Sequence, residues 1–336
     1  MDLTYFDVRE ELFESAALRG NPAGDPSARR IPVILPKTCG ALAPGAGYPV
    51  LFLLAGFTGA GRQFLNYSGW SPTLPERLDR LRARGLIGDV IAVCPDAFTV
   101  YGGSQYLSSE ATGRYEEMIV RDLVDWVDAT YPTLKGSAHR GIAGKSSGGY
   151  GALVLGMRHP DVFGAVACHS GDMYFEYCYA NDFPKLLRQL ERHGGLEGFM
   201  KAFFAAPKKT SELVLAMNIV AMAAAYSPAP SKPWRVELPM DPVTGELIDK
   251  VWQRWLEHDP VRLCERHAAN LRRLKLLYLD CGRHDQFHLQ YGLRILKKKL
   301  TALGVPHHAE EFDDDHSDTS YRYDVSLPRL WEAIRP

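Results

Sequence analysis

Short apolar segments alternate along this chain with segments that carry apolar residues at helical spacing. The helical segments cover residues 74–85, 115–131 and 149–159, and the strand-like segments cover residues 31–35, 50–55, 90–94, 140–144, 165–168 and 274–279. This alternation is typical of a mainly parallel sheet with helices on its faces, so we expect an α/β fold. Segment 50–55 is apolar on both faces, which indicates a central strand. Pro32 predicts that segment 31–35 lies at an edge, because proline cannot donate a ladder hydrogen bond.

One connection is much longer than the fold requires. About 100 residues separate the strands that end at 168 and begin at 274, whereas a crossover needs only about a dozen. The extra sequence is helical and apolar, notably over 213–225, and ends in a proline-rich stretch at 227–242. We expect an α/β core from residues 1–171 and 274–336, with 172–273 inserted as a helical cap over one end of the sheet. Helices packed on the flank, away from any site, are the alternative.

The charge balance excludes some partners. The 336 residues carry 39 Lys and Arg against 40 Asp and Glu, a net charge of −1. We therefore expect no broad electrostatic capture of nucleic acid or of an anionic membrane. The longest apolar runs, 48–57 and 221–226, are too short to cross a membrane. A small molecule is the expected partner, and a second copy of the chain is left open.

The start of the chain and the cysteines indicate a reducing compartment. Residues 1–11 are acidic and lack the pattern of a secretory signal. The six cysteines are scattered without paired spacing, and three of them lie in apolar segments. Buried free thiols in the cytoplasm are the expected state, with disulfides or a structural zinc as the alternative.

The residues Gly144-Lys145-Ser146-Ser147-Gly148 match the pattern Gly-x-Ser-x-Gly. A strand-like segment precedes them and a helical segment follows, which predicts a strand, a sharp turn and a helix with Ser146 exposed on the turn as a nucleophile. Gly144 and Gly148 leave room for the chain to pass. The N–H of Ser147, at the helix start, is a candidate oxyanion donor. A glycine-rich connecting loop is the alternative.

An activated serine needs a base, and the base needs an orienting carboxylate. In an α/β-hydrolase arrangement the acid and then the histidine follow the serine along the chain. Asp285 lies just past the strand at 274–279, and His316 lies in a loop after a short strand-like stretch. We predict Asp285 as the acid and His316 as the base. Asp280, still within the strand, is the second candidate acid.

Other histidines fit this order less well. His169 precedes the acid but could line a pocket, while His284 and His288 are too close to Asp285 in the sequence. We expect His307 and His308 to be exposed. The acidic, histidine-containing run at 307–318 leaves a metal site as an alternative, although it lacks regular ligand spacing, so we predict no metal.

A second oxyanion donor should come from the loop after the first central strand. Gly56 permits close backbone approach there, and the N–H of Phe57 is the predicted donor. A tight loop that merely connects is the alternative. The glycine-rich segment 102–106 either reaches the pocket or forms a structural turn.

Several motifs carry a family resemblance along most of the chain. They are the strand and loop at 48–56, Cys94-Pro95-Asp96, Tyr115-Glu116 with Asp122-Leu123, Arg158-His159-Pro160-Asp161-Val162-Phe163, and His169-Ser170-Gly171. In these motifs the chain resembles the esterase branch of the α/β-hydrolases. That branch contains esterase D (S-formylglutathione hydrolase), the mycolyltransferases, feruloyl and acetylxylan esterases, and enterochelin esterase-like proteins.

The resemblance implies Ser146 as nucleophile, Asp285 as acid and His316 as base, with Phe57 and Ser147 as backbone oxyanion donors. Lys145 departs from it, because esterase D-like proteins commonly carry histidine before the serine. We expect a serine esterase that needs no cofactor and acts on esters or thioesters with a medium-sized hydrophobic acyl or aryl group. An acyltransferase of the mycolyltransferase type, a peptidase and a non-catalytic binding protein on the same fold are the alternatives.

Overall fold

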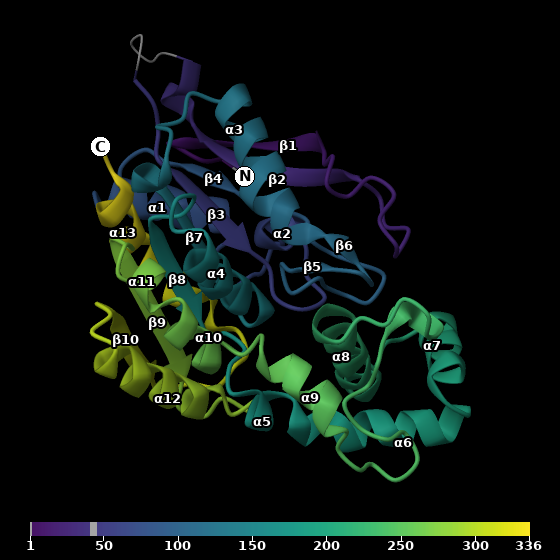
Figure 1. The fold of residues 1–336 in the computed structure, drawn as a ribbon. Helices are drawn as coiled ribbons and strands as arrows, with labels where there is room; N and C mark the ends of the chain where they lie inside the picture. Colours follow the sequence, from purple (N-terminus) through teal and green to yellow (C-terminus); the bar gives the residue numbers. More distant parts are fainter. Residues whose placement is uncertain (1, 41–45) are drawn as a thin grey trace.

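A twisted sheet runs through the length of the molecule (Figure 1). The structure is a computed structural model that describes residues 2–40 and 46–336. Within that part of the chain, eight strands pair in the order β1-β2-β4-β3-β7-β8-β9-β10, and those from β4 to β10 run parallel. The expected mainly parallel sheet is confirmed. The strands are β1 (Phe6–Glu14), β2 (Ala28–Pro36), β3 (Val50–Leu54), β4 (Ile91–Val93), β7 (Arg140–Lys145), β8 (Ala165–His169), β9 (Leu276–Gly282) and β10 (His308–Phe312), besides a small hairpin of β5 (Ser108–Ser109) and β6 (Gly113–Arg114).

The edge position predicted for segment 31–35 is wrong. β1 pairs antiparallel with the whole of β2, which places β2 inside the sheet. β4 ends at Val93, and the carbonyl of Pro32 accepts from the N–H of Cys94 just beyond that end, at 3.0 Å. The missing N–H of Pro32 therefore falls where the ladder with β4 stops, so it costs little.

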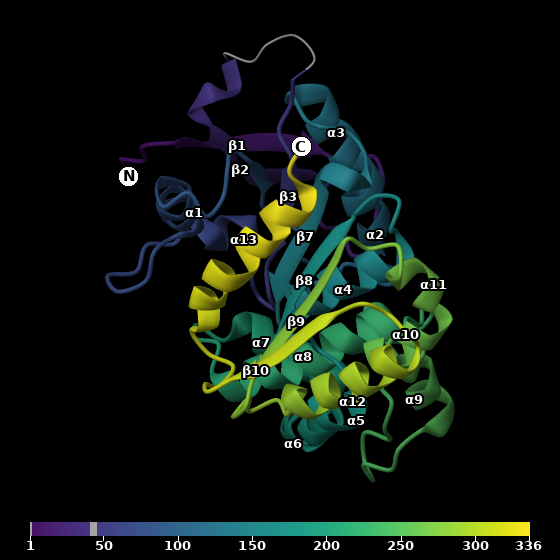
Figure 2. The same ribbon diagram turned by 90° about the vertical axis from the view of Figure 1, so that its left-hand side faces the viewer.

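Helices cover both faces of the sheet (Figure 2). The alternation of β3 explains why two layers are needed, because Val50, Phe52 and Leu54 face one apolar core while Leu51 and Leu53 face the other. The first layer of helices comprises α1 (Leu74–Ala83) and α13 (Tyr323–Ile334), and the second comprises α2 (Tyr115–Glu117), α3 (Val124–Thr130), α4 (Ser147–Arg158), α10 (Pro260–Arg266), α11 (Ala268–Leu271) and α12 (Leu289–Ala302).

The predicted helix at 115–131 is interrupted. A π-helical stretch, η3 (Met118–Leu123), joins α2 to α3. Ile119, Leu123 and Val127 are still buried on one side, while Trp126 is only partly covered. A π-turn adds a residue to the ring and shifts the register of the face, which periodicity at 3.6 residues per turn does not anticipate.

The long connection between β8 and β9 forms a helical mass beyond the ends of the strands (Figure 1). It consists of α5 (Phe175–Cys178), α6 (Phe183–His193), α7 (Leu196–Ala205), α8 (Ser211–Tyr226) and α9 (Asp249–Leu256), followed by α10 and α11. The buried apolar residues of α8 belong to the same core as Phe52 and Leu54 of β3 and Ile142 of β7. α10 and α11 pack against α4 in the layer beside the sheet. The division at residues 172 and 273 stays a prediction.

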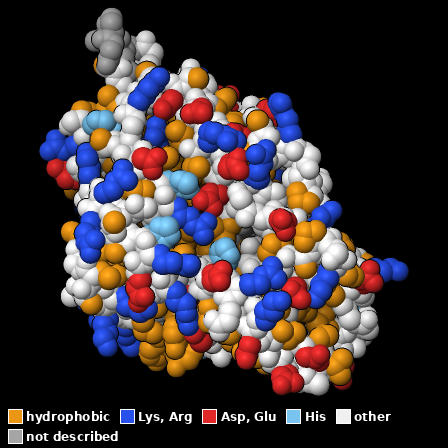
Figure 3. Space-filling view, viewed as in Figure 1, with side chains coloured by type: hydrophobic (Ala, Val, Ile, Leu, Met, Phe, Trp, Pro, Cys, Tyr) orange, Lys and Arg blue, Asp and Glu red, His pale blue; other side chains and the backbone are white. Residues whose placement is uncertain are grey.

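The surface charges, the helix lengths and the cysteines were each the subject of an expectation from the sequence. On the face seen in Figure 3, acidic and basic side chains are interspersed and neither sign dominates. Among the described residues, no helix is long and apolar enough to span a membrane. All six cysteines are free thiols, and five of them are buried.

Candidate active site

Ser146 occupies a sharp turn between β7 and α4. Its backbone has φ 58° and ψ −127°, a region that residues with a side chain rarely adopt. Two hydrogen bonds hold the turn: the N–H of Ser146 donates to the carbonyl of His169 at 3.0 Å, and the N–H of Tyr150 donates to the carbonyl of Ser146 at 2.8 Å. Ser146 lines a cavity at this turn.

Glycine is required on both sides of this turn. A Cβ on Gly144 would lie 2.3 Å from the backbone of Gly148, and a Cβ on Gly148 would lie 2.2 Å from the carbonyl oxygen of Leu54. A Cβ on Gly56 would meet the carbonyl oxygen of Lys145 at 3.3 Å. The loop after β3 therefore lies directly against the turn.

The loop after β3 also sets the position of Phe57. The N–H of Thr58 donates to the carbonyl of Gly102 at 2.8 Å, and a Cβ on Gly102 would lie 3.0 Å from the ring of Phe57. The segment 102–103 thus supports Phe57 from behind and does not line the cavity. Ser147 is the first residue of α4, where an N–H has no partner within the helix.

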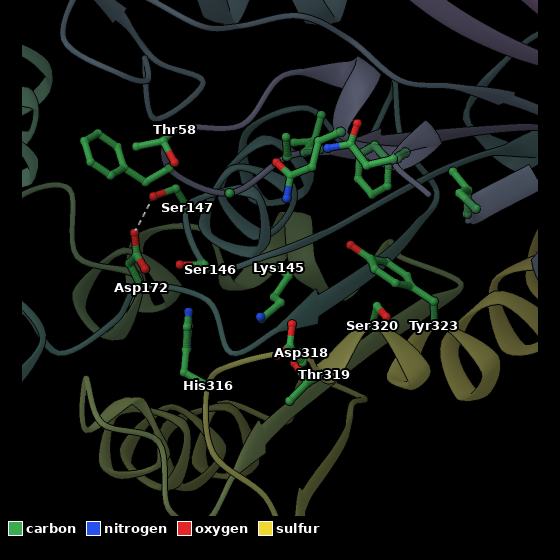
Figure 4. A pocket seen from close by; sticks show the side chains of 18 of the residues that line it. Thr58, Lys145, Ser146, Ser147, Asp172, His316, Asp318, Thr319, Ser320 and Tyr323 are labelled. Atoms are coloured by element: carbon green, nitrogen blue, oxygen red, sulfur yellow. Dashed lines mark hydrogen bonds between the residues drawn. The ribbon is translucent and has the colours of Figure 1, made fainter. Parts of the chain in front are cut away.

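His316 and Asp285 form a buried pair beside the turn. The Nδ1 atom of His316 lies 2.7 Å from Oδ2 of Asp285, and only 8% of His316 and 2% of Asp285 are exposed. The other oxygen of Asp285 accepts from the N–H of Phe287 at 2.9 Å, and the ring of Phe287 packs edge-on against the imidazole. Figure 4 shows the free end of His316 directed at Ser146.

Asp285 and His316 are 31 residues apart in the chain, and the loops after β9 and β10 bring them together. The N–H of Arg283 donates to the carbonyl of Phe312, and the N–H of His284 donates to the carbonyl of Asp314. Gly282 makes the contact possible, because a Cβ there would lie 2.4 Å from the carbonyl oxygen of Asp314. The loop that carries His316 is thereby held against the end of β9.

Asp280, the second candidate acid, bonds to His169 and Arg322 and not to His316. Its Oδ1 lies 2.7 Å from Nδ1 of His169, and its Oδ2 accepts from Arg322 at 2.9 Å. His169 also contacts the hydroxyl of Ser326 at 2.8 Å. All of Ser326 and 98% of His169 are covered, so His169 does not line a pocket as we expected it could. This buried cluster ties α13 to the sheet and does not contact His316.

The remaining histidines lie apart from Ser146. The expectation that His307 and His308 are exposed is wrong: both are half-buried, and the ring of His308 stacks on Tyr278 at 5.4 Å. His308 and Tyr278 are register partners on β10 and β9, so their rings lie on the same face of the sheet. His284 pairs with Asp313 at the surface, and His288 precedes α12. Within residues 2–40 and 46–336, no three His, Cys, Asp or Glu side chains form a metal-binding cluster.

Ser146, Ser147 and His316 line a cavity of about 530 Å³. In Figure 4, Asp172 lies on one side of Ser146, and Lys145, Asp318, Thr319 and Ser320 lie on the other. We call the part lined by residues of the 172–273 segment the insertion-side arm; these residues are Asp172, Cys178, Tyr179, Val214, Leu215 and Asn218. We call the part on the side of Lys145 the polar arm; its polar lining residues are Lys145, Gln63, Asn66, Ser68, Ser71, Arg77, Asp318, Thr319 and Ser320, beside Phe64, Pro72, Leu74 and Tyr323.

Comparison with known proteins decides the family. The family model described as "Putative esterase" matches residues 26–329. The chain belongs to this esterase family. The chain is a serine hydrolase of the esterase type, and it has the α/β-hydrolase fold, as expected.

Individual relatives of this esterase are distant. It is 28% identical to the MPT51 antigen of Mycobacterium leprae over 192 residues, which is 56% of this chain and 60% of the antigen. The match therefore spans less than two thirds of that relative. Among solved structures, it resembles a ferulic acid esterase (TM-score 0.63, 20% identity, 99% of this chain and 100% of the other). It also resembles an S-formylglutathione hydrolase of Staphylococcus aureus (TM-score 0.57, 14% identity, 100% and 99% covered). At these identities the structures show a common fold.

Two charged side chains in the esterase cavity have displaced pKa values. Burial lowers the pKa of Lys145, although the carboxylates of Asp285 and Asp318 act in the opposite direction. Burial raises the pKa of Asp172, against the hydrogen bonds that its carboxylate accepts. Lys145 was noticed in the sequence as a departure from the family, whereas Asp172 was missed. The only local signal for Asp172 is its position directly after the His169-Ser170-Gly171 motif.

Proposed function

We propose that this protein is a serine esterase that needs no cofactor and hydrolyses small carboxylic esters or thioesters through an acyl-enzyme on Ser146. One observation carries the proposal. A serine on a strained turn and the unpaired side of a histidine face the same cavity, and the other nitrogen of that histidine lies 2.7 Å from a buried carboxylate.

In the first half of the reaction, the hydroxyl oxygen of Ser146 attacks the ester carbonyl while Nε2 of His316 takes the hydroxyl proton. The carbonyl oxygen gains a negative charge and accepts hydrogen bonds from the N–H groups of Phe57 and Ser147. When the tetrahedral intermediate collapses, the bond to the alcohol breaks and His316 returns its proton to the leaving oxygen. The acyl group remains esterified to Ser146.

In the second half, a water molecule takes the place of the alcohol. His316 removes a proton from that water as its oxygen attacks the acyl-enzyme, and the same two N–H groups bind the oxyanion. Collapse releases the carboxylic acid and restores the hydroxyl of Ser146. Asp285 remains ionised throughout, orients His316 with Nδ1 protonated, and stabilises the imidazolium.

The cavity suggests how the ester lies. His316 must protonate the leaving oxygen. Asp318, Thr319 and Ser320 come two to four residues after His316 in the chain and line the polar arm. The alcohol part is therefore assigned to the polar arm. The acyl part is assigned to the insertion-side arm, where Val214 and Leu215 of α8 supply apolar walls suited to a medium-sized acyl group.

Transfer of the acyl group to an alcohol is the alternative reaction. It uses the same steps, with an alcohol in place of water in the second half. Analysis of the products formed with added glycerol or trehalose separates the two, because hydrolysis releases free acid and transfer yields a new ester.

The experiment that tests the proposal is fluorophosphonate labelling with peptide mapping. We expect one adduct, on Ser146, that is absent from Ser146→Ala. Ser147→Ala is the matched control, because it removes the neighbouring hydroxyl and keeps the backbone N–H. Absence of any adduct on the folded wild-type protein, or an adduct on another serine, would contradict the proposed nucleophile.

A further inference from the structure

A buried carboxylate lies in the insertion-side arm next to the proposed nucleophile. Asp172 is 6% exposed and lines the cavity together with Ser146 and Ser147. It lies three residues after the end of β8, on the side of Ser146 opposite to Lys145 (Figure 4). The mechanism derived above gives it no part.

All the hydrogen bonds to the carboxylate of Asp172 go to one of its two oxygens. Its Oδ2 atom accepts from the amide of Gln105 at 3.0 Å, from the hydroxyl of Tyr179 at 2.8 Å and from the hydroxyl of Ser147 at 3.1 Å. Among the described residues, no donor bonds Oδ1, and no Lys, Arg or His forms an ion pair with this carboxylate. The structure thus saturates one oxygen and leaves the other to the cavity.

The donors to Oδ2 are themselves fixed. Gln105 and Tyr179 are each 2% exposed, and the amide of Gln105 also donates to the hydroxyl of Tyr226 at 2.9 Å. Gln105 has φ 52°, a conformation that costs free energy and persists only where the surroundings impose it. The network therefore holds the carboxylate in one orientation, with Oδ1 directed to the open side.

Oδ1 is open to the cavity, so water hydrates it while the site is empty. A ligand that displaces this water without supplying a donor leaves the oxygen buried and unpaired, which costs about 1–3 kcal/mol. A group with an N–H or O–H on the ligand removes that cost on binding. A cationic donor also stabilises the ionised form of Asp172, which burial disfavours and with which no Lys, Arg or His among the described residues forms an ion pair. A ligand without such a group displaces the water and leaves Oδ1 without a hydrogen bond, which strongly lowers kcat/KM for that ligand.

We propose that Asp172 is a specificity-determining residue that selects acyl groups carrying a hydrogen-bond donor, with a protonated amine preferred over a hydroxyl. This inference rests on the proposed function, since it takes the acyl group to lie in the insertion-side arm. The expected substrates are esters of hydroxy or amino acids of medium length, bound with the donor on Oδ1 and the carbon chain against Val214 and Leu215.

The network predicts an unusual result for Asp172→Asn. Three donors surround the Oδ2 position, so the amide oxygen must take that place. The amide nitrogen then takes the place of Oδ1 and presents N–H groups to the cavity. The substitution keeps the network and converts the recognising atom from an acceptor to a donor, so the preference should be inverted.

The test compares esters of one alcohol at pH 8 with acyl chains that differ in one substituent. The first set is butanoyl with 3-ammonium, 3-hydroxy, 3-methoxy or 3-methyl substituents. The second set is hexanoyl with the corresponding groups at carbon 6. It tests whether Oδ1 contacts the acyl chain farther from the ester carbonyl. For the wild type, we expect kcat/KM for the ammonium and hydroxyl esters to exceed that of the methyl ester at least tenfold in one set.

In Asp172→Asn we expect the ratio of ammonium to methoxy ester to fall below one, whereas a merely structural role would lower kcat/KM for every ester alike. Glu212→Gln, which removes an exposed carboxylate of α8 away from the cavity, is the matched control and should keep the wild-type ratios. Equal kcat/KM values across both sets in the wild type would overturn the inference, and this result does not depend on whether the variant folds.

Binding to Ser146→Ala separates this inference from the proposed function. This variant lacks the nucleophile, so calorimetry with the intact esters measures recognition alone. Tighter binding of the ammonium ester than of the methyl ester supports the role of Asp172 even if Ser146 is not labelled by fluorophosphonate. Labelling of Ser146 together with equal affinities for all the esters would leave the esterase function standing and refute the selection by Asp172.

Discussion

Replacing Asp285 by Asn should disable the esterase while leaving its shape intact. The N–H of Phe287 donates to Oδ1 at 2.9 Å, so the amide oxygen of the variant must occupy that position. The amide nitrogen then faces Nδ1 of His316, 2.7 Å away in the wild type. Two donors cannot share that contact, so Nδ1 becomes the acceptor and the proton moves to Nε2. His316 then has no lone pair with which to take the proton of Ser146.

The same exchange in a Ser-His-Asp protease, where it traps the wrong tautomer, lowers kcat about 10⁴-fold. For this protein we expect a similar loss, which corresponds to about 5.4 kcal/mol in the activation free energy. KM should change little, because Asp285 lies behind His316 and does not line the cavity. Initial rates with a chromogenic ester near pH 7.5 measure both constants.

Asp280→Asn is the matched control, because Asp280 is equally buried and also contacts a histidine. It should leave kcat within about threefold. Breaking its buried pair with Arg322 should cost about 3–5 kcal/mol of stability. For a chain of this length that loss lowers Tm by about 4–7 °C. Full activity in Asp285→Asn together with loss of turnover in folded Asp280→Asn would refute the assignment of the acid.

Three further outcomes follow from the packing around the site. Gly148→Ala should lose about 3 kcal/mol of stability or more and its labelling by fluorophosphonate, because the new Cβ would lie 2.2 Å from the carbonyl oxygen of Leu54. Gly69→Ala, where nothing lies within 4 Å, is its control, and equal melting temperatures would contradict the clash. Leu215→Trp should fill part of the insertion-side arm and lower kcat/KM at least tenfold for hexanoyl esters but not for acetyl esters; a uniform loss would speak against that placement of the acyl chain. Burial lowers the pKa of His258 to about 4, so the unfolded chain binds its proton first and stability falls as the pH drops from about 6.5 toward 4. His258→Gln should remove about 2 kcal/mol of the loss measured between pH 7 and pH 5, and an unchanged loss would show that His258 is not the group responsible.

The sequence was informative where short-range patterns determine the outcome. The turn at Ser146 could be predicted because a strand, two glycines and a helix are adjacent in the chain. Asp285 and His316 could be proposed because each follows a strand, and parallel strands deliver their ends to one edge. The first strand, β1, was not predicted. Its nine residues include four carboxylates or arginines among residues 9–14, as an exposed edge strand often does, and they mask the alternation that marks a strand.

Asp172 could not have been recognised from the sequence in the same way. Its three donors come from the loop after β4, from α4 and from the segment after α5, which only the folded chain brings together. Likewise, the choice between Asp285 and Asp280 depends on a contact, because both lie near the end of β9. Position in the strand favoured Asp285, and the pairing of Asp280 with His169 accounts for the other carboxylate.

The apolar core that α8 shares with the sheet has a consequence for how the molecule folds and changes. Ten of its residues, from Ala216 to Tyr226, are buried, and they would be left bare if the insertion swung away as a rigid body. The insertion and the sheet are therefore expected to melt together, in one calorimetric transition. Excising the insertion would expose an apolar face prone to aggregation. A new acyl specificity is thus more accessible through single substitutions along α8 than by exchanging the insertion for one from another enzyme.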